Sequence, residues 1–165
     1  MTIAEHYERI APKLTNYLVA SGLDYAAAAD IVQETFLRVW KRRDELMDDE
    51  AQVSGFVYTI ARNLRTDLAR KNGRLSFQEE ITDEDVKETV QPQRDLEKNE
   101  ERAALRKKLN AALKEVPPLL REAFLLFQIS GLSIREIARQ TNSTESLVKV
   151  RIHRAKEKLK VLLSV

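Results

Sequence analysis

The sequence contains no cysteine, only four glycines and four prolines, and no long apolar run. The absence of cysteine excludes disulfide bonds and thiolate zinc sites. A transmembrane helix needs about 18 consecutive apolar residues, and no such stretch is present. The first ten residues, MTIAEHYERI, include two glutamates and lack the apolar core of a secretory leader. Few turn-forming residues favour long helices over many short strands, and a cytoplasmic location is the default expectation.

The chain also lacks the residue patterns of a catalytic or metal centre. Its two histidines, His6 and His153, lie in opposite halves of the sequence. No Gly-rich phosphate loop, metal-ligand cluster or nucleophile motif occurs. We therefore expect a binding protein that is not an enzyme, with no metal, no cofactor and no small-molecule substrate.

Charge is distributed unevenly along the 165 residues, although the net charge is only +2. Residues 60–74 hold five Lys or Arg and one Asp, a net charge of +4, and residues 149–160 hold six bases and one Glu, a net charge of +5. Between them, residues 76–95 hold seven acids and two bases, a net charge of −5. Two basic patches on either side of an acidic segment suggest two contacts with nucleic acid.

Apolar residues at helical spacing predict an all-α fold with two small helical domains. Helices are expected over residues 3–20, with Pro12 bending or restarting the first, then from Asp24 to about Arg43 and over residues 53–72. Helical spacing resumes near residue 96 and is interrupted at 117–118 by two prolines. The polar segment between the halves is predicted to lack fixed structure. The predicted domains are residues 1–73 and 97–165, joined by a flexible acidic linker, residues 74–96.

Residues 132–160 have the pattern of a helix-turn-helix. Ser133 and Glu136 form an S-x-x-E capping box, and Ser143 or Thr144 can cap the next helix after the turn. In that helix the buried face is predicted to hold Val148, Ile152, Ala155 and Leu159. The opposite face is predicted to hold Ser146, Val150, His153 and Glu157, flanked by Lys149, Arg154 and Lys160. Such a face can read base edges in the major groove and bind phosphates at its flanks. The alternative is a basic amphipathic helix with a solvated face.

The second predicted helix carries a polar face beside its apolar one. Val32, Phe36, Val39 and Trp40 are predicted to face the core. A separate face, spaced i, i+3, i+4 and i+7, holds Asp30, Gln33, Glu34 and Leu37. A polar strip with an exposed Leu is typical of a docking surface. Amphipathic helices also expose single leucines without consequence, so the pattern leaves both interpretations open.

The third predicted helix carries Arg62, Arg65 and Arg70 outside its inward stripe, together with Asn63. Arginines along one helix can follow a phosphate backbone. Two aromatic residues near its start, Phe56 and Tyr58, are suited either to stacking on unpaired bases or to core packing.

Three blocks of sequence in this order resemble the extracytoplasmic-function (ECF) sigma factors, the compact sigma subunits of bacterial RNA polymerase. The blocks are DIVQETFLRVW, FVYTIARNLRTDLARK and, after the acidic linker, VPPLLREAFLLFQISGLSIREIARQTNSTESLVKVRIHRAKEKL. The resemblance covers nearly the whole chain. It implies a sigma region 2 bundle of three or four helices in the first half and a sigma region 4 helix-turn-helix bundle in the second.

The resemblance also implies partners and residue roles. The face with Asp30, Gln33, Glu34 and Leu37 matches the segment that docks on the clamp coiled coil of the polymerase β′ subunit. Asn63 matches a position that captures a flipped base of the −10 element, where Arg62, Arg65 and Arg70 would hold the DNA backbone. The positions that read the −35 element correspond to Ser146, Lys149, Val150, His153 and Arg154. Core RNA polymerase, including the β flap, promoter DNA and an anti-sigma factor are the partners expected from the family.

Two other classes of protein remain as alternatives. A stand-alone helix-turn-helix regulator would bind duplex DNA without polymerase and show dyad half-site spacing. An all-helical adaptor with no nucleic-acid partner would leave both basic patches unexplained.

Overall fold

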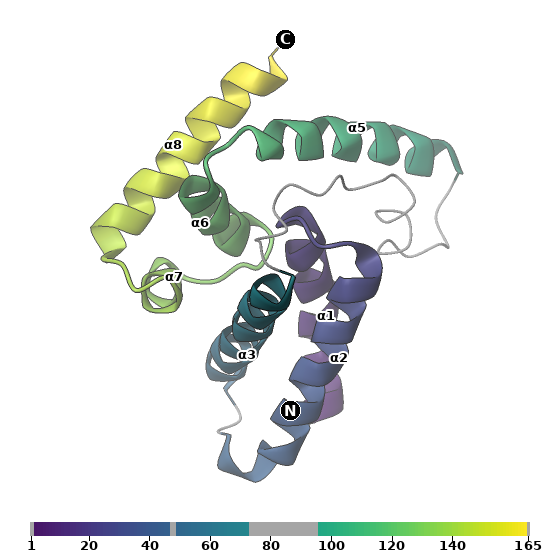
Figure 1. The fold of residues 1–165 in the computed structure, drawn as a ribbon, viewed down its shortest axis with the longest axis vertical. Helices are drawn as coiled ribbons and strands as arrows, with labels where there is room; N and C mark the ends of the chain where they lie inside the picture. Colours follow the sequence, from purple (N-terminus) through teal and green to yellow (C-terminus); the bar gives the residue numbers. More distant parts are fainter. Residues whose placement is uncertain (1, 47–48, 73–95, 165) are drawn as a thin grey trace.

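The computed structural model describes residues 2–46, 49–72 and 96–164 of the chain. In order along the chain they form α1 (Ile3–Ala20), α2 (Tyr25–Lys41), a short 3-10 helix (Arg43–Glu45), α3 (Glu50–Lys71), α5 (Leu96–Lys114), α6 (Pro118–Gln128), α7 (Ile134–Gln140) and α8 (Glu145–Leu163), as Figure 1 shows. All regular structure in these described ranges is helical, which confirms the all-α prediction. The predicted linker, apart from its last residue, lies outside the described residues.

Helices α1, α2 and α3 pack on one another to form the first bundle. Thr2 and Glu5 form a reciprocal capping box at the start of α1, and Asp24 caps α2 by accepting a hydrogen bond from the Ala27 amide at 2.7 Å. Of the two outcomes expected at Pro12, a bend or a restart, the restart does not occur, because α1 runs through Pro12 as one helix. Its long buried face supplies the packing that outweighs the loss of one backbone donor.

The predicted core position of Trp40 is also wrong. Val39 is fully buried, whereas Trp40 is 51% exposed. One residue advances a helix by about 100°, so the position after Val39 turns away from the bundle. The Trp40 ring instead lies under the guanidinium of Arg43, with 4.0 Å between the guanidinium carbon and the ring centroid.

The second half consists of α5 to α8 and contains the predicted helix-turn-helix. Pro118 occupies the first turn of α6, and Ser133 caps α7 by accepting from the Glu136 amide. Thr144 caps α8, and the predicted inward residues of α8 (Val148, Ile152, Ala155 and Leu159) are all buried. The turn before α8 contains Asn142 at a φ of 52°, a left-handed conformation that Asn tolerates better than most residues. The predicted caps at Ser133 and Thr144 and the buried face of α8 are confirmed, whereas the Glu136 side chain bonds Arg139 and Gln140.

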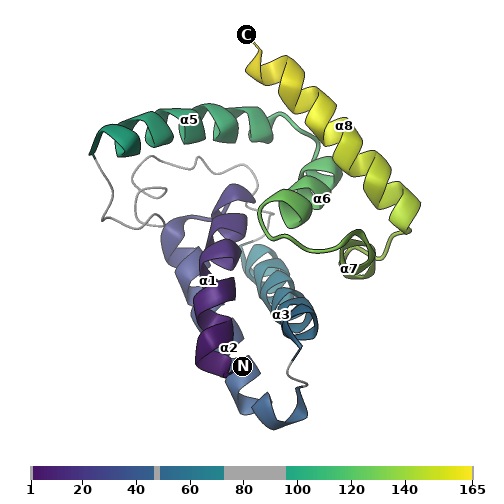
Figure 2. The same cartoon turned by 180° about the vertical axis from the view of Figure 1, so that it is seen from behind.

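The two halves are packed against each other. Contacts join α1 to α6 and α3 to α7, and the buried apolar side chains of both halves belong to one core cluster. Figures 1 and 2 show α7 beside α3 from opposite sides, with α8 at the outer edge of the molecule. The packing of α3 against the second half determines which of the predicted DNA-binding residues face solvent.

Candidate nucleic-acid and protein interfaces

The predicted reading face of α8 is open to solvent. Its five predicted residues, Ser146, Lys149, Val150, His153 and Arg154, are all exposed. Val150, the apolar member of the set, is 43% exposed, whereas Val148 and Ile152 on either side are buried. The helix therefore separates its apolar packing side from a basic side of the kind that fits a DNA groove.

The predicted −10 residues of α3 do not share one exposed surface. Asn63 and Arg70 are exposed, Arg62 is partly buried and Arg65 is 9% exposed. Arg62 and Arg65 are directed at α6, where both form ion pairs with Glu122 at 3.2 and 3.3 Å. Two of the four predicted residues are thus engaged between the halves in this structure.

Glu122 is the centre of a buried polar cluster. Tyr17 donates its hydroxyl hydrogen to Glu122 Oε1, and one terminal guanidinium nitrogen of Arg65 lies 2.8 Å from the Tyr17 hydroxyl oxygen. Tyr17 is fully buried and Glu122 is 8% exposed. Burial by itself raises the pKa of the Glu122 carboxyl, but Arg65, Arg62 and the Tyr17 hydrogen bond outweigh it and hold that pKa below its ordinary value. Burial and the Glu122 charge raise the pKa of Tyr17.

A second polar contact joins α3 to α7. Arg62 donates to the backbone carbonyl of Gln140 at 2.6 Å. The Gln140 side-chain amide donates in turn to the Gly55 carbonyl at 2.9 Å and to the Thr59 hydroxyl at 3.1 Å. Arg139 also reaches the Thr59 hydroxyl, at 3.1 Å. Because α7 is the first helix of the helix-turn-helix, these bonds tie the DNA-binding motif to the first half.

The two aromatic residues near the start of α3 have different environments. Tyr58 is buried and packs edge-to-face on Tyr17, with 5.5 Å between the ring centroids. Phe56 is partly buried beneath the guanidinium of Arg42. Of the two uses that the sequence left open, Tyr58 is used for core packing here.

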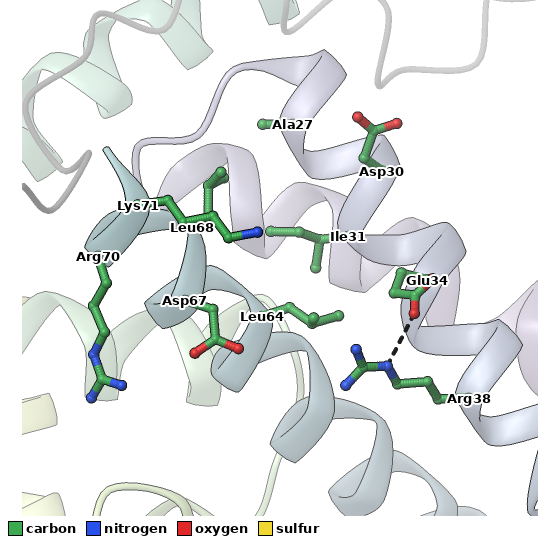
Figure 3. Close-up of a pocket in the computed structure, with 10 residues that line it drawn as sticks. All are labelled: Ala27, Asp30, Ile31, Glu34, Arg38, Leu64, Asp67, Leu68, Arg70 and Lys71. Atoms are coloured by element: carbon green, nitrogen blue, oxygen red, sulfur yellow. Dashed lines mark hydrogen bonds and ion pairs between the residues drawn. The ribbon is translucent and has the colours of Figure 1, made fainter. Parts of the chain in front are cut away.

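The predicted docking residues form an exposed ridge on α2 between two hollows. Asp30 and Glu34 border a groove of about 560 Å³ between α2 and α3, whose apolar floor includes Ile31, Leu64 and Leu68 (Figure 3). On the other side, Gln33 and Leu37 border a hollow of about 750 Å³ between α1 and α2. Leu37 is 49% exposed, and Glu34 pairs with Arg38 at 3.1 Å, the dashed line in Figure 3. A ridge of this kind presents both charge and apolar surface to a partner.

Sequence reasoning missed the roles of Tyr17 and Glu122. A signal for Glu122 exists in the helix PLLREAFLLFQ, because residue 122 lies three and four positions before Leu125 and Leu126, on the same buried face. A carboxylate on an apolar face needs a partner of opposite charge. The sequence does not identify that partner, since Arg62 and Arg65 lie about 60 residues earlier in the chain.

Within the described residues there is no group of three or more His, Asp or Glu side chains placed to hold a metal ion. Among the helices described, none is long and apolar enough to cross a membrane.

Comparison with known protein families gives a match in each half. Residues 6–75 match the model of sigma-70 region 2, and residues 106–159 match that of sigma-70 region 4. The first match spans α1 to α3, and the second covers the helix-turn-helix and α6.

Similar curated proteins include ECF sigma factors from several bacteria. The chain is 30% identical to the ECF RNA polymerase sigma factor SigL of Mycobacterium tuberculosis over 95% of this chain and 86% of the relative. It is 31% identical to SigE of Mycolicibacterium smegmatis over 83% of this chain, but spans only 52% of that relative's length. Among solved structures, the sigma factor RpoE in complex with the anti-sigma factor NepR from Bartonella quintana has a TM-score of 0.71 at 24% identity, covering 98% of this chain and 96% of that one. This structural likeness supports the fold.

Proposed function

Because the chain belongs to the ECF sigma factors of bacterial RNA polymerase, a family of transcription initiation factors, we propose that three of its surfaces bind three different ligands. The α2 ridge binds core polymerase, α3 holds melted −10 DNA, and α8 reads the −35 element. The observation that carries the proposal is the exposed basic face of α8 in one half together with an arginine-bearing α3 in the other. A stand-alone regulator is not favoured, because region 2 and region 4 family matches occur together in one chain.

The reading of duplex DNA by α8 rests on its exposed donors and its apolar contact. Arg154 has the planar guanidinium that binds guanine through two hydrogen bonds, and Val150 offers a methyl contact to thymine. Lys149 and His153 lie on the same exposed side. The buried opposite side, including Val148 and Ile152, fixes the orientation of the helix on its domain.

The melted strand is the proposed ligand of α3. Asn63 captures a base that has left the stack, and Arg62, Arg65 and Arg70 hold the backbone around it. Extruding a base costs a few kcal/mol, and contacts made only to the extruded base offset that cost. The protein thereby stabilises open promoter DNA through binding alone, without a chemical step.

Protein partners are proposed for the ridge and for the molecule as a whole. Asp30, Gln33, Glu34 and Leu37 contact the β′ clamp coiled coil, while the second half contacts the β flap. An anti-sigma factor is a further proposed partner, because a solved sigma factor of similar fold, RpoE from Bartonella quintana, is held in a complex with one.

Reconstitution with core RNA polymerase tests the proposal directly. Transcription from a promoter library is measured with and without the protein, and initiation at defined −10 and −35 sequences is expected only when it is present. Tight binding of the protein alone to duplex sites with dyad symmetry, without any effect on initiation, would support the stand-alone regulator instead.

The docking ridge is tested separately by Asp30→Ala and Gln33→Ala. Both side chains are exposed, so helix content should be unchanged and the unfolding free energy should stay within about 0.5 kcal/mol of that of the unchanged protein. Association with core polymerase should weaken. Asp44→Ala, an exposed acid on the 3-10 helix, is the matched control and should leave association unchanged. Unchanged polymerase affinity in both ridge variants would contradict the assignment.

A further inference from the structure

Glu122 makes contacts that resemble those of a phosphate group. Its carboxylate accepts hydrogen bonds from Arg62 Nε at 3.2 Å and from a terminal nitrogen of Arg65 at 3.3 Å. Carboxylates and phosphates are alternative acceptors for the same guanidinium donors, and both form charge-assisted hydrogen bonds with them. Arg62 and Arg65 are also the residues assigned to the DNA backbone under the proposed function. One pair of arginines therefore has two candidate acidic ligands.

The two ligands exclude each other in space. Arg65 is 9% exposed because α6 covers it, and Tyr17 closes the cluster from α1. A DNA strand reaches these guanidinium groups only after α6 and its Glu122 have moved away from α3. The bonds from Gln140 to Gly55 and Thr59 hold α7 against the same helix, so α6 and α7 must leave together.

We propose that Glu122 is an intramolecular competitor of DNA: it holds Arg62 and Arg65 in a closed form in which the second half covers the strand-binding surface of the first. The inference rests on the proposed function for the identity of the competing ligand. In the closed form the reading face of α8 remains exposed. The closed form can therefore still read duplex DNA through α8. Binding of a single strand by α3 requires the two halves to separate first.

The closed form depends strongly on charge at one position. A buried ion pair is destabilised when one partner is removed, because the remaining charge stays buried without compensation. Glu122→Gln keeps the shape of the side chain but removes the negative charge from Arg65. In the open form the same substitution leaves Arg65 in water, so the change acts mainly on the equilibrium between the two forms.

The first measurement is the separation of the halves in the full-length protein. Because the sequence has no cysteine, Ala4→Cys on α1 and Lys158→Cys on α8 give two unique, exposed label sites. Distances between spin labels at these sites should lengthen in Glu122→Gln. The matched control is Glu157→Gln, which removes the same charge from an exposed pair with Lys160, and its label distances should be unchanged.

The second measurement is affinity for a single-stranded oligodeoxynucleotide of mixed sequence. Glu122→Gln should bind about tenfold more tightly than the unchanged chain, because the strand-binding form is already populated. Glu157→Gln corrects for the change in net charge. Replacing Arg62 and Arg65 by Gln in the Glu122→Gln background should remove two phosphate contacts and lower the salt slope of binding by about 1.4.

Each outcome decides the proposal. Label distances in Glu122→Gln that match those of the control would overturn the closed form, and longer distances without tighter strand binding would overturn the competition. If Glu122→Gln loses helix content, Gly55→Ala provides an independent way to separate the halves, and the same two measurements apply to it. Failure of the proposed function is distinguishable, since it would appear as absent polymerase-dependent initiation in the unchanged protein, whatever the label distances.

Discussion

Gly55 allows α3 and α7 to approach closely, and replacing it by Ala tests how tightly the two halves are packed. A Cβ atom at position 55 would lie 2.6 Å from Glu136 Oε1 and 3.1 Å from Glu136 Cδ, whereas ordinary van der Waals contact begins at 3.4 Å. Moving the Glu136 carboxylate away from position 55 costs free energy. It accepts hydrogen bonds from Arg139 at 2.6 Å and from Gln140 at 3.0 Å.

Two opposing effects determine how much Gly55→Ala changes the unfolding free energy. Within α3, Ala is more favourable than Gly by about 1 kcal/mol, and this gain is kept whether or not the halves are in contact. Between the halves, moving the Glu136 carboxylate weakens its bond to Gln140, at a cost of about 1.5–3 kcal/mol for a hydrogen bond to a charged group. The overall unfolding free energy should therefore fall by only about 0.5–2 kcal/mol, while the closed form is disfavoured by about 10- to 150-fold.

Spin-label distances and urea unfolding of the full-length chain separate these effects. With labels at positions 4 and 158, Gly55→Ala should lengthen the distance between the halves. The matched control is the same substitution in a Glu136→Ala background, where the obstructing carboxylate is gone and only the helix gain of about 1 kcal/mol should remain. Gly55→Ala that raises stability by the full helix gain and leaves the label distances unchanged would refute the close packing of α3 on α7.

Three further outcomes are expected. Glu122 faces Tyr17, Arg62 and Arg65 and interacts electrostatically with its neighbour Arg121. Its pKa is lowered, so its contribution to closure is complete above the ordinary carboxyl value of about 4.3 and is lost as pH falls through the lowered value. Label distances should lengthen only in that acidic range, and Glu122→Gln should show no such step. Ile152→Ala should lower the unfolding free energy by about 2–5 kcal/mol in urea because the side chain is buried, whereas the exposed neighbour Val150→Ala should change it by about 0.5 kcal/mol or less. Arg154→Ala should weaken binding of polymerase holoenzyme to the −35 element by about 1–3 kcal/mol, and Arg154→Lys should restore the charge but not the base preference, as competition between duplexes would reveal. Equal loss on all sequences for Arg154→Ala would indicate phosphate contact only.

Local structure in the second half was predictable from sequence because its signals are short-range. Ser133 and Thr144 cap the helices that follow them, and both act within three residues. The inward face of α8 follows from a period of 3.6 residues, so Val148 and Ile152 were assigned correctly. Family resemblance rested on the same kind of contiguous pattern.

Local rules were less reliable where packing competes with them. Pro12 was expected to bend or restart a helix, but α1 continues through it as one helix with a long buried face. Trp40 was assigned to the core because it follows Phe36 by four residues on the apolar stripe, yet it is half exposed and lies beside Arg43. In both cases a single residue's preference was outweighed by the fit of a whole helix against its neighbours.

The sequence by itself determined the helices, their caps, the exposed reading face of α8 and the polar ridge of α2, because each depends on residues a few positions apart. Only the tertiary structure decided that Arg62 and Arg65 meet Glu122 and Tyr17, since these pairs are separated by 48 to 105 positions along the chain. The residues next to a surface arginine in the sequence do not determine whether its guanidinium binds phosphate, carboxylate or water. Which acid it meets depends on how the two halves pack, and here the packing of α6 against α1 and α3 supplies a carboxylate from the protein itself.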